Sequence, residues 1–213
     1  MVTYEYPRPA LTVDLVTFRV NNDQLELLLI QRDNQPFQGA WALPGGFVHE
    51  NEPLEATASR VLSAKAELTD VFLEQLATFG APERDPRDRV VSVAYFALLP
   101  AGAGYNGPGE WFAVDGLPQT AFDHAHIIDT AIDRLRAKLS YSDIGFSLMP
   151  PEFTLTELQK TWEAVLASSL DKRNFRKGAL ARDRLEATGK KTSGGAHPPA
   201  MIYRYNDSSE MTS

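Results

Sequence analysis

Residues 43–68, LPGGFVHENEPLEATASRVLSAKAEL, combine a diglycine loop with the start of a helix. Glycines at 45 and 46 let a backbone approach a phosphate closely, and a helix start is a natural anion site. Positions 61, 64 and 65 are spaced i, i+3 and i+4, so we expect them on one helix face. A divalent cation there would need carboxylates. The residues at these positions are instead Val61, Ala64 and Lys65. The pattern therefore indicates a phosphate-binding loop and helix without the acids that metal-assisted chemistry would need.

A second group of side chains, between Asp171 and Lys191, suits nucleic acid. This segment has eight basic and three acidic residues, although the whole chain has a net charge of −7. On a helix over 172–187 with Phe175 facing inward, the cations fall on the opposite face, together with Leu180. Arginine pairs with guanine, asparagine with adenine, and lysine holds phosphates. The DNA-contacting residues that we predict are Lys172, Arg173, Asn174, Arg176, Lys177, Arg184, Lys190 and Lys191, the last two in a hairpin loop. A solvated charged helix is the alternative interpretation.

The elements that carry the first group occupy residues 1–139. Apolar patterns predict a hairpin of strands at 11–20 and 25–33, a short strand interrupted by Pro44, and later strands at 71–80 and 89–100. Helical spacing predicts helices at 53–67, capped by Asn51 or Glu52, and at 123–139. Strands alternating with two main helices indicate an α+β fold, built as a sandwich with a central sheet.

Residues 140–213 differ in pattern. We predict a helix at 154–168 capped by Thr154 or Thr156, a tight turn, the basic helix, and a glycine-rich hairpin that ends in the strand MIYRY. Two helices followed by a hairpin are the plan of a winged helix-turn-helix. We therefore expect a ligand-binding domain at 1–139 and a DNA-binding domain at 140–213.

The composition excludes several classes of site. The chain of 213 residues has no cysteine, which excludes disulfides, thiolate metal sites and cysteine nucleophiles and is typical of a reducing compartment. No apolar run approaches the ~18 residues of a membrane span, and the N-terminus does not read as a signal peptide. We expect a cytoplasmic protein without a resident metal or cofactor.

The stretch GFVHENEPLEATASRVLSAKAEL resembles the Nudix box, G-x5-E-x7-R-E-U-x-E-E-x-G-U with U aliphatic. The matching residues are Gly46, Glu52, Arg60, Leu62 and Leu68; WALPGG and WFAVDGLP are also similar to the family. The resemblance implies an Mg²⁺ site at the acids of that helix, and those acids are missing here. Three interpretations remain: ligand binding without hydrolysis, hydrolysis through substitute acids, or a fold that binds no ligand. The candidate substitutes are Glu50, Glu55 and Glu67.

Nearly the whole chain resembles the NrtR family of Nudix-related regulators of NAD metabolism. The resemblance rests on FTLTELQKTWEAVLASSLDKRNFRK, DHAHIIDTAIDRLRAKL and MIYRY. It implies a Nudix-like α/β/α sandwich followed by a small winged helix-turn-helix domain, and a homodimer on double-stranded, pseudo-palindromic operator DNA. It also implies release from DNA by ADP-ribose or a related nucleotide or sugar. The effector-binding residues that we predict are Arg32, Gly45, Gly46, Phe47, Lys65, Arg84 and Arg87.

We therefore expect a repressor of NAD biosynthesis genes with no catalytic residues. An ADP-ribose pyrophosphatase with nonstandard metal ligands is the alternative. A third class is a ligand sensor whose C-terminal part binds another protein.

Overall fold

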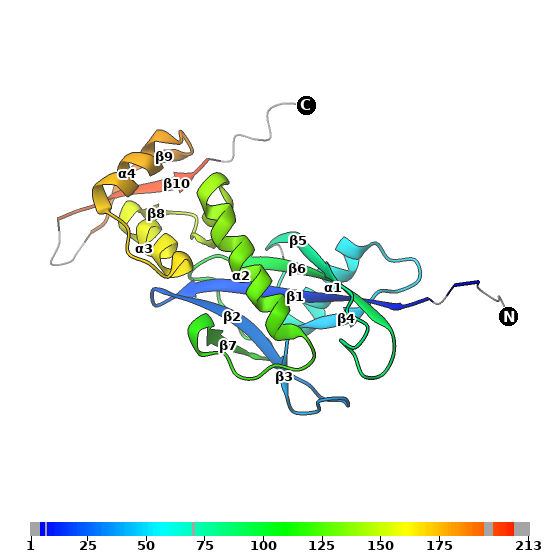
Figure 1. Cartoon of the computed structure of the whole chain (residues 1–213). Helices are drawn as coiled ribbons and strands as arrows, with labels where there is room; N and C mark the ends of the chain where they lie inside the picture. The colour runs from blue at the N-terminus through cyan, green and yellow to red at the C-terminus, as the bar shows by residue number, and fades with distance from the viewer. Residues whose placement is uncertain (1–4, 7, 70, 194–197, 207–213) are drawn as a thin grey trace.

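The structure is a computed structural model that describes residues 5–6, 8–69, 71–193 and 198–206. A mixed sheet forms its larger part, and a smaller sheet with two helices follows (Figure 1). The large sheet has the strand order β3-β2-β1-β6-β5, with β4 beside β1 and β7 beside β2. Its strands are β1 Ala10–Asn21, β2 Gln24–Gln31, β3 Trp41–Ala42, β4 Gly45–Phe47, β5 Phe72–Phe79, β6 Val90–Leu99 and β7 Glu110–Ala113, followed by the 3-10 helix η1 Val114–Gly116.

The predicted hairpin is confirmed as the antiparallel pair β1–β2. Its turn residues Asn22 and Asp23 both have positive φ, 49° and 61°, which asparagine and aspartate tolerate and which a two-residue hairpin needs. The predicted short strand around Pro44 is present as β3 and β4. The long parallel pairing of β1 with β6 makes β1 the centre of the sheet.

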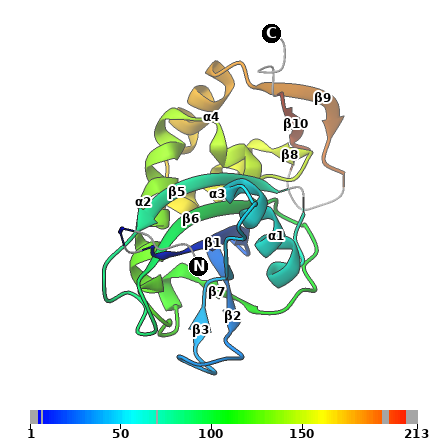
Figure 2. The same ribbon diagram turned by 90° about the vertical axis from the view of Figure 1, so that its right-hand side faces the viewer.

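Helices α1 Leu54–Ala66 and α2 His124–Tyr141 cover opposite faces of this sheet (Figure 2). Side chains alternate along a strand, so β1 serves both faces: Val13 and Leu15 pack in the α1 cluster, whereas Val16 and Phe18 pack in the α2 cluster. By the same alternation Asp14, buried in β1, lies on the α2 side. An acid is thus placed in the middle of a buried strand, facing the start of α2.

The start of α1 differs from the prediction. Pro53, rather than Asn51 or Glu52, is the N-cap residue, and no side chain caps the helix. Positions 61, 64 and 65 all lie in α1, but they differ in exposure. Val61 is 1 % exposed at the edge of the core, whereas Ala64 and Lys65 are exposed.

The second part begins after α2 and ends with the three-stranded order β8-β10-β9. The capping box of Thr154 and Glu157 starts its first helix as predicted. The second helix ends at Ala181 rather than at 187, because Asp183 has a φ of 53° and the chain then pairs as a strand. The elements are η2 Ile144–Leu148, β8 Phe153–Thr154, α3 Leu155–Leu166, α4 Lys172–Ala181, β9 Leu185–Lys191 and β10 Met201–Tyr205. Residues 194–197 of the predicted glycine-rich hairpin lie outside the described residues.

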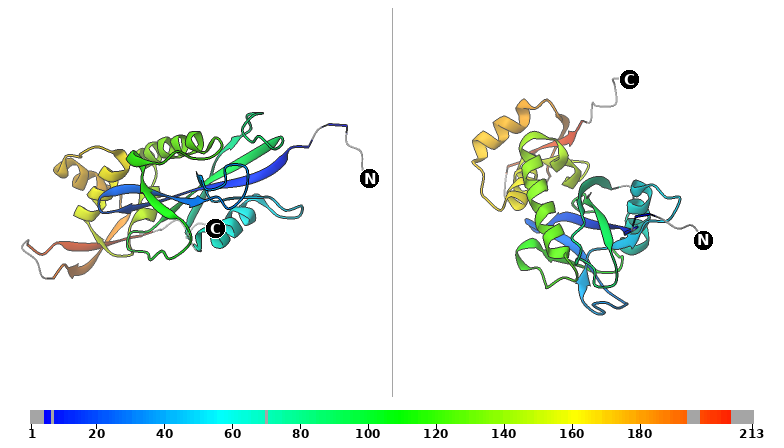
Figure 3. Two further views of the ribbon diagram at one scale, coloured as in Figure 1. Left: turned by 90° about the horizontal axis from the view of Figure 1, so that it is seen from below. Right: turned by 45° about the vertical axis from the view of Figure 1, so that its right-hand side comes forward.

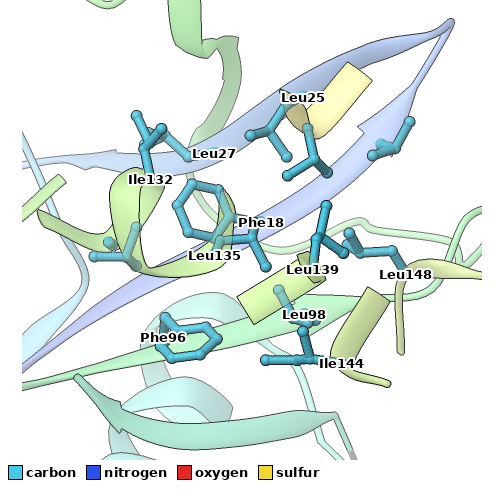
Figure 4. Packing of buried hydrophobic residues seen from close by; sticks show 14 of the residues in the cluster. Phe18, Leu25, Leu27, Phe96, Leu98, Ile132, Leu135, Leu139, Ile144 and Leu148 are labelled. Atoms are coloured by element: carbon cyan, nitrogen blue, oxygen red, sulfur yellow. The ribbon is translucent and has the colours of Figure 1, made fainter. Parts of the chain in front are cut away.

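The two parts share one hydrophobic cluster. Figure 4 shows Leu135 and Leu139 of α2 between Phe18 of the sheet and Leu148 of η2. Trp162 of α3 belongs to the same cluster. The part built on α3 and α4 therefore packs on the end of the sheet remote from the start of β1 (Figure 3). The predicted boundary at 139/140 stays a prediction; α2 itself continues to Tyr141.

Candidate functional site

A cavity of about 610 Å³ opens beside β4, α1 and the start of α2, a size typical of ligand sites. The seven effector-binding residues predicted from the sequence all line it: Arg32, Gly45, Gly46, Phe47, Lys65, Arg84 and Arg87. Residues that sequence reasoning missed also line it, and they are Asp14, Asp85, Phe122 and His124. The signal for Asp14 was an acid within an apolar strand pattern. The structure thus places the predicted residues at one site, while their role stays a prediction.

Glu52 and Arg60 hold the loop that forms one wall of this cavity. Arg60 Nε donates to Glu52 Oε1 at 2.6 Å, and Arg60 Nη2 donates to the carbonyl oxygen of Phe47 at 3.0 Å. Glu52 also accepts from the Thr57 hydroxyl and the His49 backbone N–H. Hydrogen bonding from Arg60 lowers the pKa of Glu52 from 4.5 to about 2. The pair that matches the Nudix box therefore supports the loop structurally.

Both loop glycines are required by close approach. A Cβ on Gly45 would lie 2.2 Å from Asp14 Oδ1, and a Cβ on Gly46 would lie 2.9 Å from Val61 Cγ2. These distances are shorter than side chains tolerate, so any larger residue would push β4 away from β1 and α1. Val61, which replaces an acid of the Nudix box, fills the space beneath Gly46.

A buried polar cluster centres on Asp14. Ser92 Oγ donates to Asp14 Oδ2 at 2.6 Å, and Arg84 Nη2 donates to the same oxygen at 3.3 Å. Arg84 also donates twice to Asp123, at 2.8 and 2.9 Å. The sequence predicted Arg84 as an effector-binding residue. The structure instead buries it to 7 % exposure between two carboxylates.

His124 joins the start of α2 to this cluster. Its Nδ1 accepts the backbone N–H of Leu43 at 2.9 Å, and its Nε2 lies 3.7 Å from Asp14 Oδ1. Burial lowers the pKa of His124, so the neutral ring, with its proton on Nε2, is the form that fits these contacts. The histidine fixes α2 to the cavity wall.

Three other cations face the cavity and differ in how they are paired. Arg87 makes a two-point ion pair with Asp85. Among the described residues, Arg32 donates to the backbone carbonyls of Asn34 and Pro36 and to no carboxylate. Lys65 makes no hydrogen bond or ion pair with any residue in the described part of the chain.

Aromatic rings lie beside these cations. The Arg87 guanidinium is 5.9 Å from the ring centre of Phe47 and 5.7 Å from that of Phe122, and Arg32 is 4.6 Å from Phe122. The Phe47 side chain is 49 % exposed. Flat rings with adjacent guanidinium groups suit stacking of a nucleobase.

The residues of this site do not fit a divalent metal. Within the described residues no group of three histidines or acids is arranged to hold an ion. Of the candidate substitute acids, Glu50, Glu55 and Glu67, none lines the cavity. The acids that do line it include Asp14 and Asp85, which are already engaged by Arg84 and Arg87.

Helix α4 presents the second candidate surface. Asp171 caps it by accepting the Asn174 N–H, and Phe175 packs edge-on against Trp162 as the predicted inward residue. The exposed residues on α4 include Lys172, Arg173, Asn174 and Lys177. Leu180 is 49 % exposed on the same helix. Three cations, one asparagine and one leucine are thus accessible to solvent on α4.

Four of the predicted DNA-contacting residues lie elsewhere than expected. Arg176 is half-buried and turns back to donate to Thr156 Oγ1 of α3 at 3.1 Å. Arg184 follows the helix instead of belonging to it, and its Nε lies 3.1 Å from Asp143 Oδ2. Lys190 and Lys191 belong to β9 rather than to a loop, and Lys190 pairs with Glu152 at 2.7 Å. Arg184 was misplaced because the helix is shorter than its pattern, whereas Arg176 lies in α4 as predicted but bonds to α3.

Comparisons with known proteins agree with this architecture. The NUDIX domain model matches residues 9–131, and the model of the NrtR DNA-binding winged helix domain matches residues 145–205. The ADPR responsive transcriptional repressor NtrR of Acinetobacter baylyi is 40 % identical over 210 residues, which are 94 % of this chain and 84 % of that protein.

Solved structures lead to the same family. The crystal structure of Shewanella oneidensis NrtR complexed with a 27mer DNA has a TM-score of 0.81 and 36 % identity, covering 92 % of this chain and 93 % of that one. The NUDIX domain of the same protein, complexed with ADP ribose, has a TM-score of 0.55 and 39 % identity over 61 % of this chain and 90 % of its own. With its Nudix sandwich and winged helix both matched, the chain belongs to the NrtR family of transcriptional regulators.

Proposed function

We propose that this protein is a transcriptional repressor that binds operator DNA through α4 and is released by ADP-ribose in the Nudix cavity. The observation that carries the proposal is the convergence of seven predicted residues on one cavity in a chain that also presents a basic α4. Relatives of both kinds support it: a repressor responsive to ADP-ribose, a complex with DNA and a complex with ADP ribose. The domains at 1–139 and 140–213 are the units that carry the two activities.

Helix α2 is the element that we propose to couple the two sites. Its first residue, His124, lines the cavity. Toward its other end Arg136 donates to the carbonyl oxygen of Val165 in α3 at 2.9 Å, and Leu139 packs in the shared core. The helix has 18 residues and spans about 27 Å at 1.5 Å per residue. A ligand that displaces its start changes the packing under α4.

A homodimer is part of this proposal, because an operator with two half-sites requires two copies of α4 about one helical turn apart. Ligand binding then acts by changing the spacing of the two helices, which is a coupling free energy between two sites. Sedimentation of the protein alone and with ADP-ribose tests the dimer.

We also propose that the Nudix part binds ADP-ribose without cleaving it, because the cavity lacks an arrangement of acids for metal-assisted attack by water. The alternative is hydrolysis by an unusual donor set. Incubation with ADP-ribose and Mg²⁺, followed for release of AMP, separates the two, and sustained turnover would establish the enzyme.

The deciding experiment for the regulator is a gel shift on the DNA upstream of the protein's own gene, with and without ADP-ribose. Arg173→Ala is expected to weaken binding by about 1–3 kcal/mol if Arg173 reads a base edge. The matched control is Arg134→Ala, the same charge change at a half-buried position of α2, away from α4. No shift at low salt would favour a partner other than DNA, and equal loss in both variants would remove Arg173 from the base-reading set.

A further inference from the structure

Lys65 stands on the cavity side of α1, at a position where the Nudix pattern has a metal-binding acid. Its neighbour Ala64 also lines the cavity and offers no ligand, and Val61 is turned into the core. An ammonium group at this place repels a divalent cation and attracts an anion. At this position of α1, the chain therefore has a positive charge where the Nudix pattern has a negative one.

The cations that line the cavity differ in whether an acid pairs with them directly. Arg84 is held by Asp14 and Asp123, and Arg87 is held by Asp85. Arg32 and Lys65 have no ion-pair partner among the described residues, although Asp14 and Asp33 attract Lys65 at longer range.

The pKa values of these two cations move in the direction that such crowding requires. Desolvation at the cavity wall lowers the pKa of Lys65, and repulsion by Arg32 lowers it further. Burial also lowers the pKa of Arg32, with repulsion by Arg87 as the next cause. Positive groups that destabilise one another are relieved by a bound anion, so this wall of the cavity favours a ligand with concentrated negative charge.

We propose that the Lys65 ammonium, with Arg32 beside it, neutralises the diphosphate of the ligand and takes the place of the divalent cation that metal-dependent Nudix proteins use. The inference rests on the proposed function for the identity of the ligand, ADP-ribose. It goes beyond that function by stating that binding needs no metal. Two cations facing a diphosphate dianion match it in charge, and a lysine contributes its charge without activating water.

The experiment is a calorimetric titration of the whole protein, once in EDTA and once in Mg²⁺. The ligands are ADP-ribose and inorganic pyrophosphate. Wild-type protein is expected to bind ADP-ribose with the same affinity, within about twofold, in both buffers. Lys65→Met is expected to bind ADP-ribose about 10- to 100-fold more weakly in EDTA, which is the loss typical of removing a hydrogen bond to a charged group. Lys160→Met, which removes another exposed lysine at 51 % side-chain exposure, is the matched control and is expected to bind normally.

Lys65→Glu tests whether an acid at this position makes binding depend on a metal. The affinity of this variant for ADP-ribose is expected to be low in EDTA and to rise when Mg²⁺ is added. Lys65 is exposed on a helix surface, so both variants are expected to keep the wild-type melting temperature.

The outcomes separate this inference from the proposed function. Wild-type binding of ADP-ribose that requires Mg²⁺, or Lys65→Met binding as tightly as wild type, would overturn the inference and leave the regulator standing. Pyrophosphate binding in EDTA that depends on Lys65, without any binding of ADP-ribose, would support the inference and remove the proposed effector. Failure of both ligands to bind in EDTA would overturn the inference.

Discussion

Replacing Arg84 by methionine should destabilise the protein strongly, because it leaves a buried carboxylate without its cation. The Arg84 side chain is 4 % exposed and that of Asp14 is 9 % exposed, with Nη2 and Oδ2 3.3 Å apart. At an effective dielectric constant of about 20, this separation corresponds to a gross attraction of about 5 kcal/mol. Removing one partner of a buried pair typically costs about 3–5 kcal/mol in the free energy of unfolding.

The companion variant is Asp14→Asn, which removes the charge but can keep the Ser92 hydrogen bond. Arg84→Met combined with Asp14→Asn should cost less than the sum of the two single changes, by about 1–3 kcal/mol. Urea unfolding followed by circular dichroism gives the three free energies. In a thermal scan, Arg84→Met alone should lower Tm by roughly 6–20 °C for a chain of this size.

Two results would refute this reasoning. Arg84→Met within about 1 kcal/mol of wild type would mean that Asp14 is not stabilised by the arginine. Additive single and double variants would mean that the two groups are not coupled. An ADP-ribose titration of the double variant then tests the role of Arg84. Retained affinity would make Arg84 a structural residue. Lost affinity in a stably folded double variant would make it a ligand contact, as the sequence predicted.

Three further predictions concern other parts of the fold. Thr154→Ala should lower the free energy of unfolding by about 1 kcal/mol through loss of the capping box, measured by urea unfolding with Thr156→Ala as control. Glu52 has a folded-state pKa of about 2 against an ordinary 4.5, so its stabilising effect is present above pH 4.5 and is lost as the pH falls toward 2. The Tm difference between wild type and Glu52→Gln should therefore shrink over that range, and a constant difference would contradict it. Gly145→Ala would place a Cβ 2.5 Å from the Trp162 ring and should cost about 1–3 kcal/mol; a normal Tm would show that the core yields there.

The sequence alone determined the order of elements and the location of both candidate surfaces. Alternation and helical spacing are local properties, so β1, β2, α1, α2 and α3 appear where the apolar pattern places them. The Nudix box could be recognised because Gly46, Glu52 and Arg60 form a local unit of loop and helix. The loss of carboxylates was equally visible, since it is a matter of residue type.

What each charged side chain does was decided only by tertiary structure. Arg84 and Asp14 are seventy positions apart and meet because β1 and the loop before β6 converge at the start of α2. The end of α4 at Ala181 could not be predicted from the sequence either, because the segment after it forms β9 by pairing with β10, more than ten residues later. The sequence specifies which positions carry a charged side chain. Whether that charge is free for a ligand depends on partners that distant segments bring to it, and for Lys65 the described fold brings no ion-pair partner, whereas Arg84 receives two.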